Sequence, residues 1–576
     1  MIRFIPLVLT SSKILLAIPF AGILMTSCIR RENQVHVTLK QFQVPVLKYR
    51  QNNPVLQIKL VVPENVASEK VSSFTISADG TDDLADIMAI RLFYMGKDSM
   101  WIRYEDTPEK AGNILDPIPS DDFRPIQFGE EMPPASEITF RDEQMLEPGD
   151  NYFWVMYELS DMADLHHTAD AGCNKIKLDK GGFISPELSS PPVVQRIGVA
   201  LRQPMDENVD TYRIPGLATT NKGTLLALYD ARHESSRDLQ GDIDIVVNRS
   251  TDGGNTWEPN RLVLDMGEWG GLPRKFNGVS DPCIVVDENS EKIFIAGLWM
   301  HGLLDTAGRW IEGLTDESTF WEHQWRRKGS QPGFGVKQTS QFLISESTDD
   351  GQSWSPPVNL THMCKKLEWW LWAPAPGRGI TADDGTLVIP TQGRDAEGKA
   401  FSNITYSKDG GITWKTSNPA YSGTNECSVV QLSDGTLMLN MRYRPPRGEK
   451  TGRIIAVTDD LGDTWTEHPT SRTGLPEPVC MGSLHKHIYI EGGERKSVLL
   501  FSNPNVDKNP RSRITIKASF DDGLTWPDKF RLLLDEGYGR GYSCLTSIDE
   551  KTIGIVYEGS QADMIFESIP LNEIIK

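Results

Sequence analysis

Five copies of one short pattern, Ser-x-Asp-x-Gly-x-Thr-Trp, limit what this 576-residue chain can fold into more than any other feature. Asp and Ser or Thr side chains bond the local backbone in tight turns, Gly takes φ values that other residues avoid, and Trp packs between sheets. Each copy is therefore predicted to be a β-hairpin turn whose Asp is structural rather than catalytic. The copies begin at Ser250, Ser347, Ser407, Thr458 and Ser519.

The spacing of the copies indicates a repeating β architecture. Most copies lie 51 to 61 residues apart, which suits one four-stranded propeller blade with its loops. The first gap is 97 residues and predicts an insertion. Tryptophans gather in that insertion and after the second copy, where they either form the rim of a ligand site or pack a long loop. They are Trp299, Trp310, Trp321, Trp325, Trp369, Trp370 and Trp372.

The chain before the repeats has a different pattern. From about 33 to 183 it shows short alternating segments such as 55–62 and 152–157, without a long helical period, which predicts an all-β sandwich. The Pro- and Ser-rich stretch 184–192 is a plausible linker. A sandwich in this position serves either to bind carbohydrate or as a spacer.

Residues 1–28 have the features of an export signal. Arg3 and Lys13 supply positive charge before an apolar run that ends at Met25. This run is too short for a transmembrane helix. Thr26-Ser27-Cys28 follows it. This favours a lipoprotein signal with a lipid anchor at Cys28, and an ordinary cleaved signal is the alternative. We expect a location in the periplasm or at the outer membrane, with the anchor facing the periplasm.

Charge and cysteine content exclude several functions. The net charge of −20 leaves no basic excess for nucleic acid, although a few buried Arg residues could still hold a small anion. The cysteines after Cys28 contain no CxxC spacing and are predicted to be buried thiols. Pairs such as His166-His167 and His485/His487 lack a matching ligand set, so neither a metal site nor a cofactor is predicted.

The five turns are similar to the Asp-boxes (BNR repeats) of bacterial exo-sialidases, or neuraminidases. Tyr212-Arg213-Ile214-Pro215 matches the Arg-Ile-Pro motif that precedes the first box in this family. The resemblance covers roughly residues 199–570. The segment before it resembles the N-terminal module of Bacteroides-type enzymes. The implied fold is all-β, with a β-sandwich at 29–190 and a six-bladed β-propeller at 191–576. The implied activity is retaining hydrolysis of terminal sialic acids from glycoproteins, glycolipids and oligosaccharides.

Sialic acid carries a carboxylate on its anomeric carbon, so a site for it needs fixed positive charge. The resemblance assigns this role to Arg213, Arg442 and Arg511. Arg513 is a rival for the third position, because two residues along a strand return to the same face. Pro215 is expected to push Ile214 towards an extended conformation.

The same carboxylate would repel an ionised Asp or Glu nucleophile, whereas a neutral tyrosine avoids the like charge. Tyr542 matches the family's Gly-Tyr-Ser motif and is the implied nucleophile, with Tyr538 as a weaker candidate. Glu426 matches the carboxylate that takes the tyrosine proton, and its alternative role is a cap or ion pair.

The implied acid/base lies in the carboxylate-rich segment 231–244. The family pattern Asp-Leu-Gln selects Asp238, with Asp242 as runner-up and Asp244 in the next strand. The resemblance also places three supporting residues, for each of which an ordinary structural role is the alternative. Arg232 and Asp281 would contact a ring hydroxyl, and Glu558 would orient Arg213.

Functions of other classes remain open from the sequence. Asp-boxes also occur in non-enzymatic propellers and sorting receptors, so the repeat alone predicts a fold. A trans-sialidase, or a propeller that binds sialic acid without turnover, would share the same core.

Overall fold

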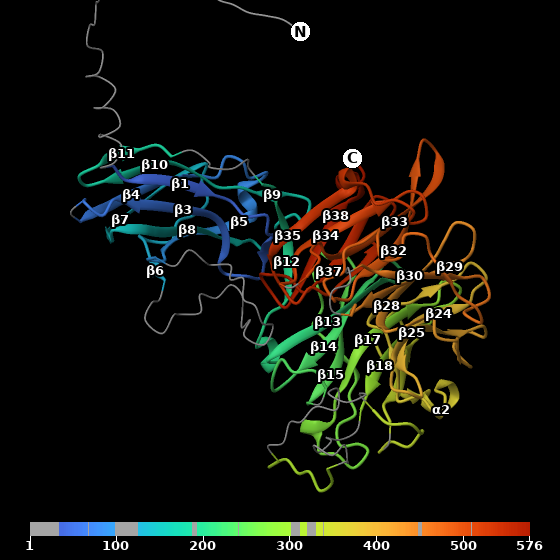
Figure 1. The fold of residues 1–576 in the computed structure, drawn as a ribbon. Helices are drawn as coiled ribbons and strands as arrows, with labels where there is room; N and C mark the ends of the chain where they lie inside the picture. Colours follow the sequence, from blue (N-terminus) through green and yellow to red (C-terminus); the bar gives the residue numbers. More distant parts are fainter. Residues whose placement is uncertain are drawn as a thin grey trace, which may run out of the picture.

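The computed structural model describes residues 34–66, 68–97, 125–186, 193–239, 241–300, 311–318, 330–337, 339–446, 452–508 and 510–576. The predicted signal and the anchor at Cys28 lie outside these residues. Strands form almost all of the regular structure, so the all-β prediction is confirmed (Figure 1). None of the described helices has the length and apolarity that a membrane crossing requires. The described helices are η1 (Leu84–Asp86), η2 (Asp206–Asn208), η3 (Arg274–Phe276), α2 (Thr361–Cys364), η5 (Asp528–Phe530) and α3 (Leu571–Ile574).

The N-terminal unit consists of two sheets with strand orders β1-β3-β8-β5-β6 and β11-β10-β4-β7. The sheets meet through aromatic rings: Phe74 of one sheet lies 4.7 Å from Phe153 of the other, between ring centroids. The strands are β1 (His36–Lys40), β3 (Asn53–Val62), β8 (Gly149–Leu159), β5 (Ile87–Tyr94), β6 (Ile126–Gln127), β11 (Gly182–Ile184), β10 (Gly172–Leu178), β4 (Glu69–Ser77) and β7 (Glu137–Leu146).

The rest of the described chain forms sheets that succeed one another along the sequence. The first three have the orders β13-β14-β15-β16, β20-β19-β18-β17-β22 and β21-β24-β25-β26, with β23 on β24 and β27 on β25. Their strands are β13 (Thr211–Thr219), β14 (Leu225–Arg232), β15 (Ile243–Ser250), β16 (Arg261–Leu264), β17 (Val279–Val286), β18 (Ile293–Trp299), β19 (Gln341–Ser347), β20 (Val358–Asn359), β21 (Leu371–Pro374), β22 (Gly377–Arg378), β23 (Ile380–Thr381), β24 (Leu387–Arg394), β25 (Ala400–Ser407), β26 (Lys415–Thr416) and β27 (Tyr421–Ser422).

Three further sheets have the orders β28-β29-β30-β31, β32-β33-β34-β35 and β2-β12-β38-β37-β36, with β9 on β12. Their strands are β28 (Thr424–Gln431), β29 (Leu437–Tyr443), β30 (Ile454–Thr458), β31 (Thr466–Glu467), β32 (Ser483–Glu491), β33 (Glu494–Pro504), β34 (Ser512–Ser519), β35 (Arg531–Tyr538), β2 (Val46–Lys48), β9 (Thr168–Ala169), β12 (Gln195–Arg202), β36 (Ser543–Ser547), β37 (Thr552–Tyr557) and β38 (Met564–Pro570).

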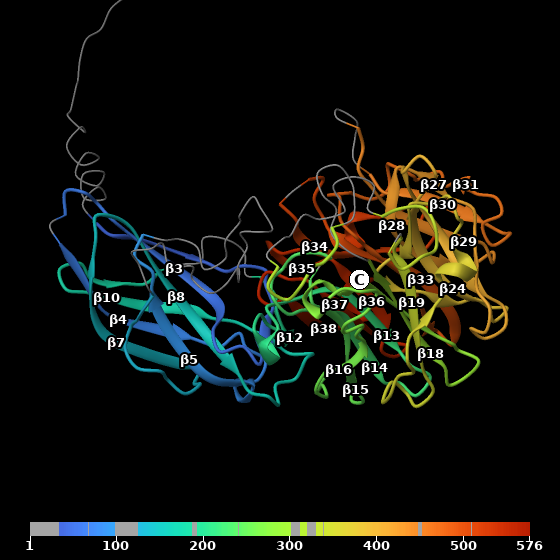
Figure 2. The ribbon, with the colours of Figure 1, turned by 90° about the horizontal axis from the view of Figure 1, so that it is seen from below.

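The inner strands of these sheets follow a closed path. Strands β13, β17, β24, β28, β32 and β36 each pack against the next, and β36 packs against β13. Figures 1 and 2 show the sheets gathered around one centre beside the N-terminal unit. The closed path brings residues that are hundreds of positions apart to one central region.

The five repeat turns have the predicted structural role. In the third copy, Ser407 Oγ accepts a hydrogen bond from Gly411 N at 2.9 Å, and Asp409 accepts hydrogen bonds from the backbone and hydroxyl of Thr413. Equivalent bonds occur in the other copies. The turns join the third strand of a sheet to its outer strand, far from the centre.

The turn glycines also permit close packing between sheets. Gly411 has φ of 85°, and a Cβ there would lie 2.4 Å from Phe294 in the preceding sheet. The same close approach links Gly254 to Phe566 and Gly351 to Leu226. Gly is thus needed at these positions both for its backbone conformation and for its lack of a side chain.

A strand from the N-terminal unit completes the last sheet. Residues of β2 pair in parallel with β12, and the Nζ of Lys48 donates to Asn255 O, in the first repeat turn, at 3.0 Å. Lys48 is only 1% exposed. The two units therefore share a sheet edge and a buried contact.

Candidate active site

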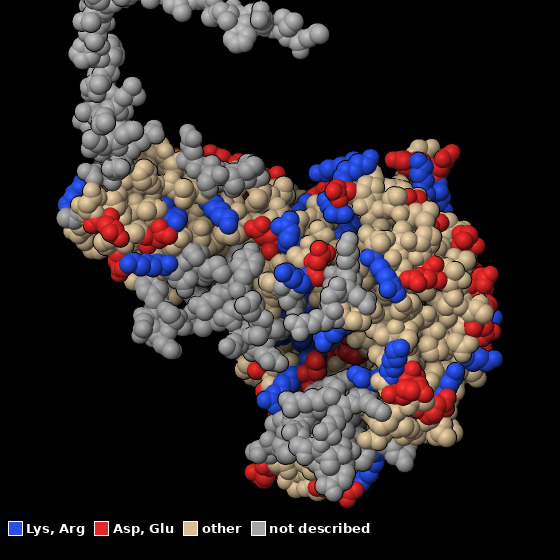
Figure 3. Space-filling model, in the orientation of Figure 1, with Lys and Arg blue, Asp and Glu red and all other residues tan. Residues whose placement is uncertain are grey.

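The candidate site lies where inner strands of several sheets begin or end. It combines Arg213 of β13, Glu426 of β28, Arg442 of β29 and Tyr542 immediately before β36. Figure 3 shows a hollow on this face near β13 and β14, with both basic and acidic atoms at its floor. The residues come from three parts of the ring, namely β13, the paired strands β28 and β29, and the segment before β36, and the closed ring of sheets brings them together.

Tyr542 is the centre of a short hydrogen-bonded network. Its hydroxyl donates to Glu426 Oε1 at 2.6 Å, and Arg442 Nη1 donates to the Tyr542 oxygen at 2.8 Å and to Glu426 Oε2 at 2.6 Å. Tyr542 is 6% exposed and Glu426 8%. Burial raises the pKa of Tyr542 well above its usual value, and the Arg442 charge opposes that rise. The phenol is thus neutral at rest, with a carboxylate positioned to take its proton.

A bulge explains why Glu426 leaves the strand ladder. The register of β28 against β29 shifts between Thr424 and Cys427. Such a bulge redirects a side chain from the regular alternation. The local sequence thereby presents Glu426 to Tyr542 from a strand whose other residues are mostly core.

Glu558 ties Arg213 to the backbone around Tyr542. It accepts hydrogen bonds from Arg213 Nε at 2.6 Å, from Ile214 N at 3.0 Å and from Tyr542 N at 3.0 Å. It is 2% exposed. Burial opposes its ionisation, but the Arg213 charge and the hydrogen bonds outweigh burial and lower its pKa.

The expectation of an extended Ile214 is wrong. Its φ is 63°, and the register of β13 shifts between Arg213 and Gly216. A positive φ is costly for a β-branched residue, and the Glu558 bond to Ile214 N helps to hold it. The preference imposed by Pro215 is overridden by this tertiary contact.

Two arginines flank the ring of Tyr542. The guanidinium carbons of Arg213 and Arg511 each lie 5.6 Å from the ring centroid. Arg511 also donates to Arg540 O at 2.8 Å and to Val479 O at 2.5 Å. With Arg442 on the hydroxyl, three positive charges surround one buried phenol.

Arg513, the rival to Arg511, lies elsewhere. It is exposed, has φ of 63°, and sits at a register shift between Ser512 and Ile514. The expectation that Arg511 and Arg513 share a face is wrong, because the bulge breaks the two-residue alternation.

Arg232 connects Asp238 to the interior. Its Nη1 donates to Asp238 Oδ1 at 2.7 Å and to Ser236 O at 3.0 Å, while its other nitrogens donate to Asp230 Oδ2. Arg232 is 1% exposed, whereas the Asp238 side chain is 65% exposed. Asp238 is therefore an accessible carboxylate held at one oxygen by a buried cation.

The two rival acids face different groups. The Asp238 charge acts on Arg213 and Asp281, both on the central side. Asp242 instead lies near Asp244 and 3.7 Å from Arg274, and burial followed by the Asp244 charge raises its pKa to about 6. Asp238 therefore acts on residues of the central site, and Asp242 lies beside Arg274.

Asp281 and Gln392 close another side of the site. Asp281 has φ of 58° within a bulge of β17, and Gln392 Nε2 donates to its Oδ2 at 3.3 Å. Burial, followed by the charge of Glu426, raises the pKa of Asp281 well above its usual value. Burial and the neighbouring carboxylate therefore both favour the neutral form of Asp281.

Sequence reasoning missed Asp230, the fully buried partner of Arg232. Asp230 also accepts a hydrogen bond from Ser280 Oγ at 2.6 Å, and burial raises its pKa to about 6. An available signal was the Asp-Ala-Arg spacing, which puts Asp230 and Arg232 on one face of β14.

His233, Asp242 and Asp244 were also not grouped in advance. They bring one possible ligand atom each within 4.8 Å of one another, and His233 Nε2 lies 2.9 Å from Asp244 Oδ2. His233 N also donates to Asp242 O at 3.0 Å, which closes the loop carrying Asp238.

The aromatic and thiol predictions had mixed outcomes. Trp299 and Trp372 are 0% exposed and Trp369 is 4% exposed, so a role at the rim is wrong for these three, which pack the core. Trp310, Trp321 and Trp325 lie outside the described residues. The prediction of buried thiols is confirmed for Cys173, Cys283, Cys364, Cys427, Cys480 and Cys544.

Comparisons with known proteins cover nearly the whole chain. A model of the BNR repeat-like domain matches 214–526, and a model of the N-terminal domain of BNR-repeat neuraminidase matches 34–182. A Bacteroides fragilis sialidase is 39% identical over 545 residues, 94% of this chain and 95% of the relative. A Micromonospora viridifaciens sialidase is 31% identical over 362 residues, which are 61% of this chain and 50% of that relative. The solved structure of the Hadza microbial sialidase Hz136 has a TM-score of 0.81 at 37% identity, with 93% of this chain and 100% of that chain covered.

Proposed function

The chain belongs to the BNR-repeat sialidase (neuraminidase) family of glycoside hydrolases, and we propose that it is an exo-α-sialidase that cleaves terminal sialic acids with retention of configuration. The observation that carries this proposal is the Tyr542 network: a buried phenol 2.6 Å from a carboxylate oxygen and between arginines. Sialidases as a class use a tyrosine nucleophile where most glycoside hydrolases use a carboxylate.

Arg213, Arg442 and Arg511 would bind the carboxylate of the substrate. Each guanidinium presents a planar fork of donors that suits a carboxylate. Glu558 would fix Arg213 and, through the same carboxylate, the backbone of Tyr542. The bound carboxylate would then sit above the ring that carries the nucleophile.

Glycosylation of the enzyme would be the first step. As the Tyr542 oxygen bonds to the anomeric carbon, its proton passes to Glu426, and the bond to the leaving oxygen breaks. Asp238 donates a proton to that oxygen, so that an alcohol leaves. A neutral tyrosine approaches without the repulsion that an ionised nucleophile would meet from the substrate's carboxylate.

Hydrolysis of the adduct would complete the cycle. Asp238, now ionised, takes a proton from water as the water oxygen attacks the anomeric carbon. The bond to Tyr542 breaks, and Glu426 returns the proton to the phenolate. The exposure of Asp238 supports this role, because water and the leaving group both need access to it.

Arg232 and Asp281 would contact the sugar ring. Arg232 presents one buried fork near Asp238, and Asp281 offers a carboxyl on which the charge of Glu426 acts. Either could bind a ring hydroxyl. The substrates would be sialylated glycoproteins, glycolipids including gangliosides, and oligosaccharides.

A fluorogenic sialoside assay with an active-site trap tests the mechanism. The wild-type protein should release the fluorophore and, with a fluorinated sialic acid, should carry a covalent adduct on Tyr542 that peptide mass spectrometry locates. Tyr542→Phe should form no adduct there. An adduct on another residue, or turnover without any adduct, would contradict the proposed nucleophile.

Product analysis separates the alternatives. A hydrolase releases free sialic acid, whereas a trans-sialidase with lactose present forms a sialylated lactose. A binding propeller without turnover would retain sialic acid affinity but release nothing. Dominant transfer to lactose, or binding without release, would each contradict the proposed hydrolysis.

The six-bladed propeller is the architecture that we propose for the catalytic unit. It is supported by the closed path of inner strands from β13 to β36. The N-terminal unit would bind carbohydrate or hold the propeller away from a membrane. The N-terminal unit, produced separately, is tested on a sialylated glycan array. Binding would support the first role, and no binding the second.

Export and lipid anchoring at Cys28 remain proposals. Metabolic labelling with a fatty-acid probe in a bacterial host should label the wild-type protein in the membrane fraction and leave Cys28→Ala unlabelled. Equal labelling of both proteins would contradict the anchor.

A further inference from the structure

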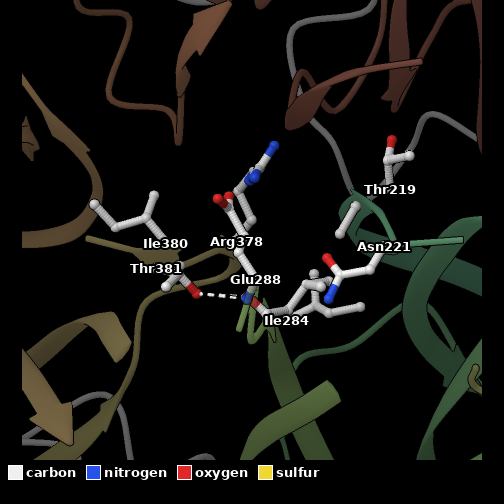
Figure 4. Close-up of a pocket in the computed structure, with 10 residues that line it drawn as sticks. Thr219, Asn221, Ile284, Glu288, Arg378, Ile380 and Thr381 are labelled. Atoms are coloured by element: carbon white, nitrogen blue, oxygen red, sulfur yellow. Dashed lines mark hydrogen bonds between the residues drawn. The ribbon is translucent and has the colours of Figure 1, made fainter. Parts of the chain in front are cut away.

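A second cavity lies at the far end of the inner strands. Its volume is about 250 Å³, and its lining includes Thr219, Asn221, Glu288, Arg378 and Thr381 (Figure 4). Thr219 ends β13, whereas Arg213 stands near its start, so about 20 Å of strand separates them. The cavity is thus distinct from the pocket that contains Tyr542.

Arg378 makes no ion pair in this cavity, although Glu288 belongs to the same lining and its charge acts on Arg378. Its Nη1 donates to His485 Nδ1 at 3.2 Å, to Thr546 Oγ1 at 3.2 Å and to Leu545 O at 3.4 Å. Within the described part of the chain, no carboxylate lies within 4.0 Å of this guanidinium. Burial lowers the pKa of Arg378, and the charge of Glu288 offsets this only in part.

The histidines beside Arg378 supply no negative charge. Since His485 Nδ1 accepts from Arg378, its Nε2 donates to Ser547 Oγ at 2.8 Å. The Ser547 hydroxyl then donates to His487 Nδ1 at 2.7 Å, and His487 Nε2 donates to Glu550 O at 3.2 Å. Burial lowers the pKa of both histidines. Both rings are therefore neutral. In this series of hydrogen bonds, every donor points away from Arg378.

The other polar groups of the wall are already used. Asn221 Nδ2 donates to Asp287 O and Ser290 O, and Thr219 Oγ1 donates to Ser547 O. Thr381 Oγ1 donates to Val286 O. In contrast, no hydrogen bond from Arg378 Nη2 occurs among the described residues. The lining therefore leaves a guanidinium donor facing the space.

We propose that this cavity binds a small oxyanion, such as inorganic phosphate or a simple carboxylate, on Arg378. A planar guanidinium matches the paired oxygens of such anions. The volume equals roughly eight water molecules, at about 30 Å³ each, which is enough for a small anion and its hydration water. Glu288 opposes binding but is exposed, so its carboxylate can remain in water.

Calorimetric titration with inorganic phosphate tests this site. Saturating sialic acid is included so that the arginines around Tyr542 are occupied. The wild-type protein should bind one phosphate in the millimolar range, and Arg378→Met should weaken binding by ~10-fold or more, as expected for a lost charge-assisted contact. Equal binding to Arg378→Met would overturn the proposal, as would the absence of binding of both phosphate and acetate to wild type.

Matched variants keep the test informative if Arg378→Met is poorly folded. Glu288→Gln changes an exposed residue and should tighten phosphate binding, because it removes the one acidic side chain of the lining. Arg513→Met removes an exposed arginine elsewhere and should leave binding unchanged. Unchanged affinity in Glu288→Gln, or loss in Arg513→Met, would place the bound phosphate outside the cavity.

A second titration distinguishes the sources of the oxyanion. Acetate is titrated into wild type and Glu288→Gln under the same conditions, at constant ionic strength set with chloride. Binding of acetate alone identifies carboxylates as the ligand class, and binding of phosphate alone identifies inorganic oxyanions. Failure of both contradicts the cavity's role without affecting sialoside turnover at Tyr542.

Discussion

The repeat turns and the catalytic pocket both depend on carboxylates, but they use them in opposite ways. Asp409 lies in an exposed turn and is satisfied by Thr413 within four residues of sequence. Glu426 is buried and is satisfied by Tyr542 and Arg442, which come from other strands. A turn therefore works wherever its sequence occurs, whereas the pocket exists only after the sheets have closed.

The turns and the pocket also differ in the direction of their pKa shifts. Hydrogen bonds from Thr413 lower the pKa of Asp409 to about 2. In the pocket, burial raises the pKa of Tyr542 and Asp281, and neighbouring charges modify that rise. Groups with perturbed protonation that converge in a cleft mark a functional site, and the turns lack that combination.

The largest expected effect follows from removing the proton acceptor. Glu426→Gln keeps the shape of the side chain but cannot take the Tyr542 proton, so kcat for a fluorogenic sialoside should fall by ~10²–10⁴-fold. Asp409→Asn, in the exposed turn, should keep kcat within about twofold. Comparable losses of kcat in both variants would contradict a catalytic role for Glu426 and a structural role for Asp409.

A turn glycine should affect stability without affecting chemistry. Gly411→Ala places a Cβ 2.4 Å from Phe294 at φ of 85°, and should lower the free energy of unfolding by ~2–4 kcal/mol. Gly410→Ala is the matched control, since φ is 66° there but no atom lies within 4 Å of the added Cβ. Denaturant unfolding should show the smaller loss for Gly410→Ala, and kcat of both folded variants should match wild type.

Arg511 and Arg513, near β34, should differ in their effect on substrate binding. Arg511→Ala removes a guanidinium beside Tyr542 and should raise KM by ~10–100-fold, the worth of one charged hydrogen bond. Arg513→Ala, at an exposed position, should leave KM unchanged. A larger KM effect from Arg513→Ala would reverse their assignment.

The smallest expected effect is a pH dependence of the turns. Because the pKa of Asp409 is lower in the folded state, near 2, than the unfolded value of about 3.9, its stabilisation is complete above pH ~4 and is lost as the pH falls towards 2. Asp409→Ala should therefore melt below wild type at pH 6, and the difference in Tm should shrink below pH ~4. A constant difference down to pH 2 would show that the ionised carboxylate is not the stabilising species.

Much of the fold could be predicted because its signals are local. The turn pattern, the two-residue alternation and the absence of a helical period depend on neighbours within a few residues, so the all-β class followed from them. Bulges were not predictable in the same way. Those at Arg213, Glu426, Asp281 and Arg513 depend on register against a partner strand, and they decide which of these side chains reach the site.

The five turns and the all-β class follow from the sequence alone, because each turn closes its own hydrogen bonds within four residues. The sequence also nominated Arg213, Glu426, Arg442 and Tyr542, but it could not bring them together. The packing of separate sheets places Arg511 and not Arg513 beside the tyrosine, pairs Asp230 with Arg232, and leaves Arg378 without an ion pair. These are properties of burial and of distance between separate sheets, and no spacing along the chain encodes them.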